Sequence, residues 1–400
     1  MTVRILTGDC VDIMRTLPNE SIDAIVTDPP YGLAFMGKAW DTAKDPRAFQ
    51  QRAYEWSLEM GRVLKPGGHL LAFGGTRTYH RLACGLEDAG FEIRDSLHWL
   101  YGSGFPKSLN LDGGLGTALK PAHEPIVLAR KRLIGTVAAT VAKYGTGALN
   151  VEACRVGTDV VHSNGGGFSD SFRVMEGRPD RQAPKPSDSV GRWPPNLLLS
   201  HTPECIEGGA CAEDCPVAEM DRQSGELTSG KMLATQERKA TLGGGGYGGG
   251  FGSIAAHNDT PGDSGGASRF FPVFRYEAKP SRAEREAGLT GATRVGGGHV
   301  AQQDGKRMGR TADEGANVRQ LPLVRNIHPT VKPIALMAWL VQLVTPKGGT
   351  VLDPFLGSGT TAIACQRLGL DCIGIEKEAE YVAIAEARIR GDAPLFAKVD

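Results

Sequence analysis

Both ends of the 400-residue chain alternate strand patterns with helix patterns, and this alternation restricts the fold more than any other feature. Short apolar runs that end in turn residues indicate strands, and apolar residues spaced three or four apart indicate helices. The first hundred residues predict strands at 3–7, 22–27, 69–73 and 91–100, and helices at 10–17, 47–64 and 76–88. The last seventy predict helices at 333–344, 360–368 and 378–390, and strands at 350–355 and 372–376. We therefore predict an α/β fold with a mostly parallel sheet and helices on both faces.

One turn signal and one glycine-rich segment interrupt this alternation of strands and helices. Lys65-Pro66-Gly67-Gly68 predicts a turn that stops the second helix. From Lys231 to Ile327 the chain holds 19 of its 54 glycines, with 14 basic against 9 acidic residues. We predict that 1–134 and 328–400 are two halves of one domain. Residues 135–327 are then an inserted region, glycine-rich and in part disordered.

Charge and targeting signals limit the class of protein. The chain has 45 basic and 45 acidic residues, which argues against a histone-like binder but allows local basic patches. The start lacks the pattern of a secretory signal, and no apolar run reaches the roughly 18 residues that span a bilayer. Eight cysteines without such a signal are typical of reduced thiols. We expect a cytoplasmic protein without membrane contact, with Cys365 and Cys372 in its core.

A glycine-containing loop is predicted at 353–361, between a buried strand and a helix. Gly357 and Gly359 allow the backbone to turn sharply beside a ligand, and the helix start offers free N–H groups. Glu376 ends the next strand, where its carboxylate can accept hydrogen bonds from ribose hydroxyls. No lysine follows the glycines, which excludes a phosphate-binding Walker loop.

The spacing Gly357-x-Gly359-x-x-Ala362 also fits a dinucleotide fingerprint, so a nicotinamide enzyme is one alternative. Asp353 at the strand tip would repel a pyrophosphate but suits a cationic ligand. S-adenosylmethionine combines an adenosine for Glu376 with a sulfonium and an ammonium for Asp353. We therefore predict S-adenosylmethionine as the cofactor.

A second loop, Asp28-Pro29-Pro30-Tyr31, follows another buried strand. Two prolines fix an extended exit from the strand and donate no N–H. The Asp28 carboxylate and the Pro29 carbonyl can therefore converge as acceptors, with the Tyr31 ring beside them. Such a cluster suits a planar ring that carries an exocyclic amine, although the tetrapeptide also occurs as an ordinary loop.

Together these motifs resemble the site-specific DNA amino-methyltransferases in their permuted, beta-class order, including prophage-type members. The catalytic tip is Asp28 to Tyr31, and the cofactor loop is Phe355-x-Gly357-x-Gly359. Asp9-Cys10 is similar to the segment that contacts the cofactor's adenine, and 328–333 to the element that holds its methionine moiety. The stretch 116–131 is also similar to prophage-type members, and the resemblance covers 1–131 and 325–390.

This resemblance implies a Rossmann-like, S-adenosylmethionine-dependent methyltransferase fold whose sheet is split across the two termini, with a target-recognition region inserted. The implied catalytic residues are Asp28, Pro29, Pro30 and Tyr31. The implied cofactor-binding residues are Asp9, Cys10, Thr330, Lys332, Asp353, Phe355, Gly357, Ser358, Gly359, Thr360 and Glu376.

The predicted reaction is methyl transfer to the N6 amine of an adenine flipped out of double-stranded DNA. In the family an Asp at the first tip position favours adenine and a Ser favours cytosine, so N4-cytosine methylation is the first alternative. Methylation of RNA or protein and non-catalytic nucleic-acid binding are further alternatives. A homodimer and a cognate restriction endonuclease are possible partners, and an orphan or phage-borne role stays open.

Three other groups have two interpretations each. His201, Cys205, Cys211 and Cys215 could form a zinc site or be ordinary loop thiols; they lack paired C-x2-C spacing, so we assign no metal ligand. Trp99 and Tyr101, before Gly102, Gly104 and Pro106, could line the base pocket or belong to the core. Five basic residues around 270–274 could contact phosphates: Arg269, Arg275, Lys279, Arg282 and Arg285. For the last two, a solvated helix face is the alternative.

Overall fold

The computed structural model describes residues 1–34, 39–41, 45–102, 109–163, 187–202, 204–205, 210–228, 263–274, 289, 294–295, 323–324, 326, 328 and 330–392. Within these ranges, no helix has the length and apolar character needed to cross a membrane.

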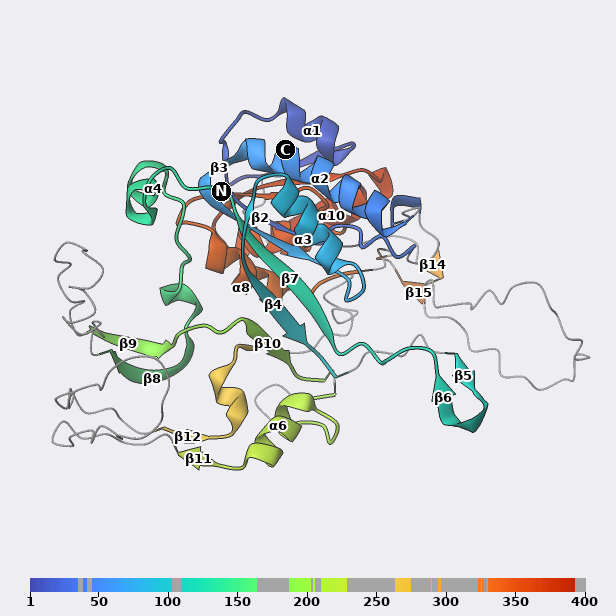
Figure 1. The fold of residues 1–400 in the computed structure, drawn as a ribbon, viewed down its shortest axis with the longest axis vertical. Coiled ribbons are helices and arrows are strands. Elements are labelled where there is room, and N and C mark those ends of the chain that lie inside the picture. Colours follow the sequence, from blue (N-terminus) through green and yellow to red (C-terminus); the bar gives the residue numbers. More distant parts are fainter. Residues whose placement is uncertain are drawn as a thin grey trace, which may run out of the picture.

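A nine-stranded sheet forms the centre of the protein, in the order β1-β17-β16-β2-β3-β7-β4-β10-β13 (Figure 1). Its strands are β1 (Val3–Thr7), β2 (Ile22–Thr27), β3 (Leu64–Phe73), β4 (Glu92–Leu100), β7 (His123–Arg130), β10 (Leu197–Ser200), β13 (Val273–Phe274), β16 (Thr350–Asp353) and β17 (Asp371–Glu376). β7 is antiparallel to both β3 and β4, and the other neighbours are parallel. Every strand of this sheet except β7 therefore points the same way.

Helices cover both faces of the sheet, which confirms the predicted α/β class. One face carries α1 (Cys10–Thr16), α2 (Pro46–Val63) and α3 (Tyr79–Asp88), and the other carries α8 (Ile334–Val344), α9 (Thr360–Leu368) and α10 (Ala379–Asp392). Alternation along β3 shows why: Leu70 and Ala72 pack with the first set of helices, and Leu71 and Phe73 with the second. The buried thiols of Cys365 and Cys372 lie in the second core, as predicted.

Strands from the two ends of the chain lie together in one half of this sheet, which runs from the edge strand β1 through β17 and β16 to β2. β1 pairs with β17 and β2 pairs with β16, so strands hundreds of residues apart are neighbours. This confirms the predicted split of the sheet across the termini. From within the expected insertion, β10 and β13 extend the edge beyond β4, so this region is joined to the sheet by backbone hydrogen bonds.

The remaining elements are short and peripheral. They are α4 (Val137–Tyr144), α6 (Pro216–Ser224), and the paired strands β5 (Asn110–Leu111) with β6 (Leu115–Gly116), β8 (Val156–Ser163) with β9 (Ser187–Arg192), β11 (Leu227–Thr228) with β12 (Ser264–Gly265), and β14 (Arg294–Val295) with β15 (Leu323–Val324). In Figure 1, α6, β11 and β12 lie beyond the β10 edge, and the β5–β6 hairpin projects from the body. The domain boundaries stay predictions, and the predicted disorder falls on residues outside the described ranges.

The predicted turn at 65–68 is wrong in one respect. Helix α2 does end at Val63, but β3 begins at Leu64 and includes all four turn residues. Ile22 on β2 pairs with Leu64, whereas Ala24 pairs with His69, so the extra residues form a bulge within the strand. Gly67 has φ +76° and donates its N–H to the Lys131 carbonyl, which keeps the bulge bonded to the chain.

Candidate functional site

Four acidic side chains lie where neighbouring strands of the sheet end. Asp9 follows β1, Asp28 follows β2, Asp353 ends β16 and Glu376 ends β17. The carboxyl ends of parallel strands meet at one edge of a sheet, which is where α/β proteins bind ligands. All four residues line a single cavity of about 1780 Å³. The structure thus brings both predicted motifs into one site.

The glycine loop is held by the acid that the sequence assigned to ribose. The Gly357 N–H donates to Glu376 Oε2 at 2.8 Å, and the Glu378 N–H donates to Oε1 of the same carboxylate at 2.8 Å. Gly357 has φ +56°, and a Cβ there would lie 2.7 Å from His328 Nε2. Only glycine fits such a position without strain.

Asp353 is more deeply buried than the sequence suggested. Its carboxylate accepts hydrogen bonds from the hydroxyls of Thr27 and Thr361, both at 2.6 Å, and from the Phe355 N–H at 3.0 Å. Burial raises its pKa to about 6, although these three donors act in the opposite direction. Besides lining the cavity, Asp353 therefore ties β2 to the start of α9.

Arg388 supports the same loop and was missed by the sequence analysis. This fully buried side chain on α10 donates from Nη1 to the Ser358 carbonyl at 2.6 Å, to the Ser358 hydroxyl at 3.0 Å and to the Thr360 hydroxyl at 3.3 Å. An arginine in an amphipathic helix is usually exposed, so the position of Arg388 in the sequence does not indicate that it supports this loop.

Asp9, Cys10 and Phe355, which we predicted to bind the cofactor, line the wall of the cavity near β1. Asp9 caps α1 by accepting from the Val11 N–H at 3.1 Å. The Phe355 ring packs edge-on against Trp56 with ring centroids 4.7 Å apart, so an aromatic wall adjoins the carboxylates. Burial raises the pKa of the Cys10 thiol to about 12, which leaves it protonated and unsuited to nucleophilic attack.

The predicted tip forms a compact hydrogen-bonded cluster with two further residues. The Tyr31 hydroxyl lies 2.8 Å from Asp28 Oδ1 and 3.1 Å from Glu124 Oε2. Lys332 Nζ donates to Asp28 Oδ2 at 2.6 Å and lies 3.3 Å from Glu124 Oε2. The structure therefore places Lys332, predicted on the cofactor side, against the tip.

The charges of this cluster depend on one another. Burial disfavours the Lys332 ammonium, but the carboxylates of Asp28 and Glu124 outweigh burial and raise its pKa above the ordinary lysine value. Burial also raises the pKa of Tyr31 well above its usual range, and both carboxylates add to this. Lys332 is therefore cationic and Tyr31 a neutral donor at physiological pH.

Glu124 was missed because the sequence does not reveal the direction of β7. Its strand runs opposite to its neighbours, so the beginning of β7 lies at the edge where the other strands end. Glu124 pairs with Trp99 across β4 and β7 and thereby reaches the tip.

The remaining predicted residues have mixed outcomes. Pro29, Pro30, Ser358, Thr360 and Thr330 line the cavity, as does the buried His328. Gly359 does not line it but adopts φ +84° at the start of α9.

Two aromatic residues at the end of β4, Trp99 within the strand and Tyr101 just after it, serve both the core and the cavity. Trp99 donates from Nε1 to the Ser200 hydroxyl at 2.7 Å and is buried, and Tyr101 packs against it with centroids 5.2 Å apart. Both also line the cavity. Of the residues that follow them, Gly104 and Pro106 lie outside the described ranges.

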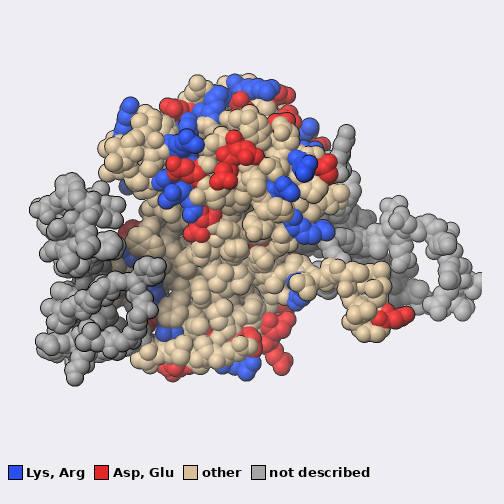
Figure 2. Space-filling model, in the orientation of Figure 1, with Lys and Arg blue, Asp and Glu red and all other residues tan. Residues whose placement is uncertain are grey.

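The residues singled out in the inserted region also have different outcomes. The side chains of His201, Cys205, Cys211 and Cys215 come together, with their ligand atoms all within 4.8 Å of one another. Arg269 forms hydrogen bonds within the inserted region: it donates to Asp263 and to the carbonyls of Gly265, Gly266 and Leu227. The other four basic residues named with it are outside the described part of the chain. On the face in Figure 2, basic and acidic side chains are interspersed.

We expect Gly357→Ala to weaken S-adenosylmethionine binding by at least about tenfold, which is about 1.4 kcal/mol. The new methyl group would combine a strained φ with a collision against His328, so the loop must move. Isothermal titration of the purified variant measures the effect. Gly348→Ala is the matched control, since Gly348 has φ +71° with open space around it. Equal affinity in wild type and Gly357→Ala would contradict the assignment of this loop.

Comparisons with known proteins identify a family. Residues 22–387 match the protein family described as DNA methylase. The type II methyltransferase M2.DpnII of Streptococcus pneumoniae is 38% identical over 89 residues, which are 22% of this chain and 33% of that protein. The type II methyltransferase M2.LlaDCHI of Lactococcus lactis subsp. cremoris is 42% identical over 66 residues, which are 16% of this chain and 24% of that protein. The chain thus spans no more than a third of the length of these curated relatives.

Among solved structures, the cytosine-N4-specific PvuII DNA methyltransferase aligns with 97% of this chain and 86% of its own chain. The sequence identity is 14% and the TM-score is 0.47.

Proposed function

Because this chain belongs to the DNA methylase family, we propose that it methylates the N6 amine of adenine in double-stranded DNA. S-adenosylmethionine is the cofactor. The observation that carries the proposal is the position of the Asp28–Tyr31 tip beside the glycine loop and Glu376, in one cavity. A donor and an acceptor of a methyl group must meet in such a space.

In the proposed reaction Asp28 accepts a hydrogen bond from the exocyclic amine, together with the carbonyl of Pro29. These bonds localise the nitrogen lone pair, which is otherwise delocalised into the ring. When bound, S-adenosylmethionine supplies an electrophilic methyl group on a sulfonium. The new N–C bond forms as the S–C bond breaks, and the cationic nitrogen then loses a proton to the solvent or to Asp28. Positioning accounts for most of the rate.

Lys332 and Glu124 prepare the tip for this role. The ammonium of Lys332 lies between the carboxylates of Asp28 and Glu124, 2.6 Å from the first and 3.3 Å from the second, and holds them close together. The hydroxyl of Tyr31 is fixed by the same two carboxylates, which orients its ring along the cavity. We propose that the ring stacks on a flipped base. The family resemblance gives Lys332 a second, cofactor-side role, and that role stays a prediction.

We propose adenine over cytosine on the Asp at the first tip position. We expect nucleosides from DNA methylated by the purified protein to contain N6-methyladenine. Mass spectrometry of the digest separates this nucleoside from N4-methylcytosine, and an Asp28→Ala sample is the blank. N4-methylcytosine alone would overturn the choice of base but not the class of reaction. Methylated RNA or protein with unmodified DNA would overturn the substrate class.

The partners implied by the sequence are also proposals. Double-stranded DNA is the proposed substrate, and the inserted region 135–327 is the proposed reader of its sequence. A homodimer and a cognate endonuclease remain predictions.

A further inference from the structure

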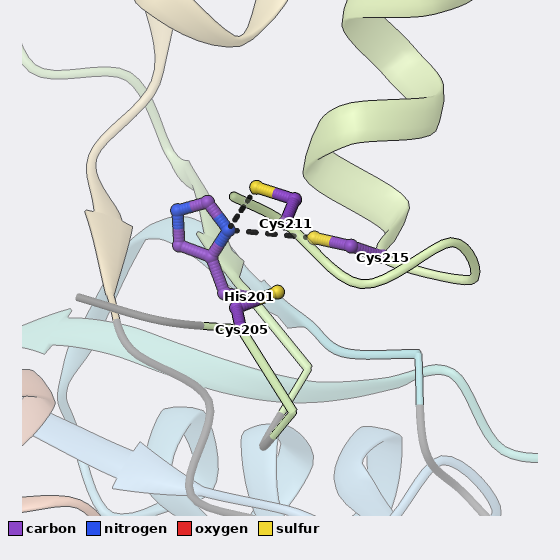
Figure 3. A group of neighbouring side chains, drawn as sticks. All are labelled: His201, Cys205, Cys211 and Cys215. Atoms are coloured by element: carbon purple, nitrogen blue, oxygen red, sulfur yellow. Dashed lines mark hydrogen bonds between the residues drawn. The ribbon is translucent and has the colours of Figure 1, made fainter. Parts of the chain in front are cut away.

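Four side chains outside the cavity point their sulfur and nitrogen atoms at a common centre. They are His201, Cys205, Cys211 and Cys215 (Figure 3). His201 Nδ1 lies 3.4 Å from Cys215 Sγ and 3.5 Å from Cys211 Sγ. All three cysteines are free thiols. The sequence could not decide the matter, because it lacks C-x2-C pairs.

The four ligand atoms lie close enough together for one tetrahedral metal ion to bind all of them. Zn–S bonds near 2.3 Å and Zn–N bonds near 2.0–2.1 Å separate a ligand nitrogen from a sulfur by about 3.6 Å, and two sulfurs by about 3.8 Å. The two N···S distances here are 3.4 and 3.5 Å, and no two of the four ligand atoms are more than 4.8 Å apart. We propose that these four side chains bind one structural zinc ion.

The surroundings favour thiolate ligands. The Ala212 N–H donates to Cys205 Sγ at 3.3 Å, and the Thr202 hydroxyl lies 3.3 Å from the same sulfur. Cys215 is the N-cap of α6, where the helix dipole stabilises negative charge. Such outer contacts orient metal ligands and stabilise their charged form. Four protein ligands fill a tetrahedral shell, so the site is structural and not catalytic.

The site joins the peripheral part of the insertion to the main sheet. His201 directly follows β10, whose neighbours are β4 and β13, and its N–H donates to the Phe274 carbonyl at 2.9 Å. At the other end of the site, α6 holds Ser268 through Asp221, with bonds of 2.7 Å to its N–H and its hydroxyl. Among the described residues, the apolar cluster between these parts has a buried centre of four residues, with six partly buried residues packed around it; the four are Leu199, Cys205, Cys215 and Val217. The ion therefore supplies a connection that such a small core lacks.

The first experiment measures metal content in the full-length protein. We expect about one zinc ion per chain after purification without chelators. Cys211→Ser tests the site, because Cys211 is exposed and its loss disturbs little packing, and Cys84→Ser is a control outside the cluster. After dialysis against a competing chelator, we expect zinc in Cys211→Ser to fall at least about tenfold relative to Cys84→Ser. No zinc in the wild type, or equal retention in the two variants, would overturn the proposal.

A second measurement identifies the ligand set. Cobalt(II) exchanged into the protein should give the intense visible bands of a tetrahedral ion and thiolate charge-transfer bands, and His201→Ala should alter both. A weak octahedral spectrum would contradict the proposed ligands. Thiol alkylation under denaturing conditions, without reductant, should count all three cysteines as reduced; a disulfide among them would also refute the site. These readouts do not depend on methyltransferase activity.

Discussion

We expect Asp28→Asn to lower the kcat of methyl transfer by about 100- to 10,000-fold, while the Kd for S-adenosylmethionine stays near the wild-type value. The amide keeps the size of the side chain but removes the charge that receives the amine hydrogens and pairs with Lys332. Because the variant affects the transition state more than cofactor binding, kcat falls with little change in the KM for the cofactor. Radiolabel transfer from S-adenosylmethionine to DNA measures the rate, and calorimetry measures the Kd.

Asp12→Asn is the matched control for this variant. Asp12 is an exposed aspartate on α1 whose partner, Arg15, lies one turn away at 3.2 Å. Its loss should leave both parameters unchanged, since an exposed pair of this kind contributes little. Full activity in Asp28→Asn would remove the tip from the mechanism.

The fold was predictable because its signals are local. Apolar runs such as Ile22–Thr27 and helix boundaries such as Thr360–Leu368 are recorded in neighbouring residues, and the structure reproduces them closely. The bulge at 65–68 was not predictable, since a Pro-Gly-Gly run indicates a turn whether or not a partner strand is present. Its state depends on the Lys131 carbonyl, far along the chain.

The candidate site likewise contains residues that the sequence predicted and residues that it did not. Residues on the strand ends, such as Asp28 and Glu376, were found because strand order and loop composition place them together. The sequence analysis missed Glu124 and Arg388 because their roles depend on tertiary geometry. Glu124 reaches the site because β7 is antiparallel to its neighbours, and Arg388 lies on the buried side of α10. A buried charge in an otherwise ordinary element becomes recognisable only once its partners are known.

Lys332→Met tests whether the cation serves the tip or the cofactor. If it serves the tip, the carboxylates of Asp28 and Glu124 lose their shared counter-charge and the contacts that hold them in place. We then expect kcat to fall on the order of 100-fold, with the KM for S-adenosylmethionine near the wild-type value. A Lys332 that serves only the cofactor would instead raise the KM for S-adenosylmethionine and leave kcat near the wild-type value.

Two further variants separate charge from packing in this experiment. Adding Glu124→Gln to Lys332→Met removes one of the two carboxylates that are left without a counter-charge, so part of the lost kcat should return. Lys65→Met is the matched control, because Lys65 forms a 2.7 Å pair with Asp23 that lies away from the cavity. It should lower the melting temperature without changing kcat. No recovery of kcat in the double variant would show that Glu124 does not act on Asp28 through charge.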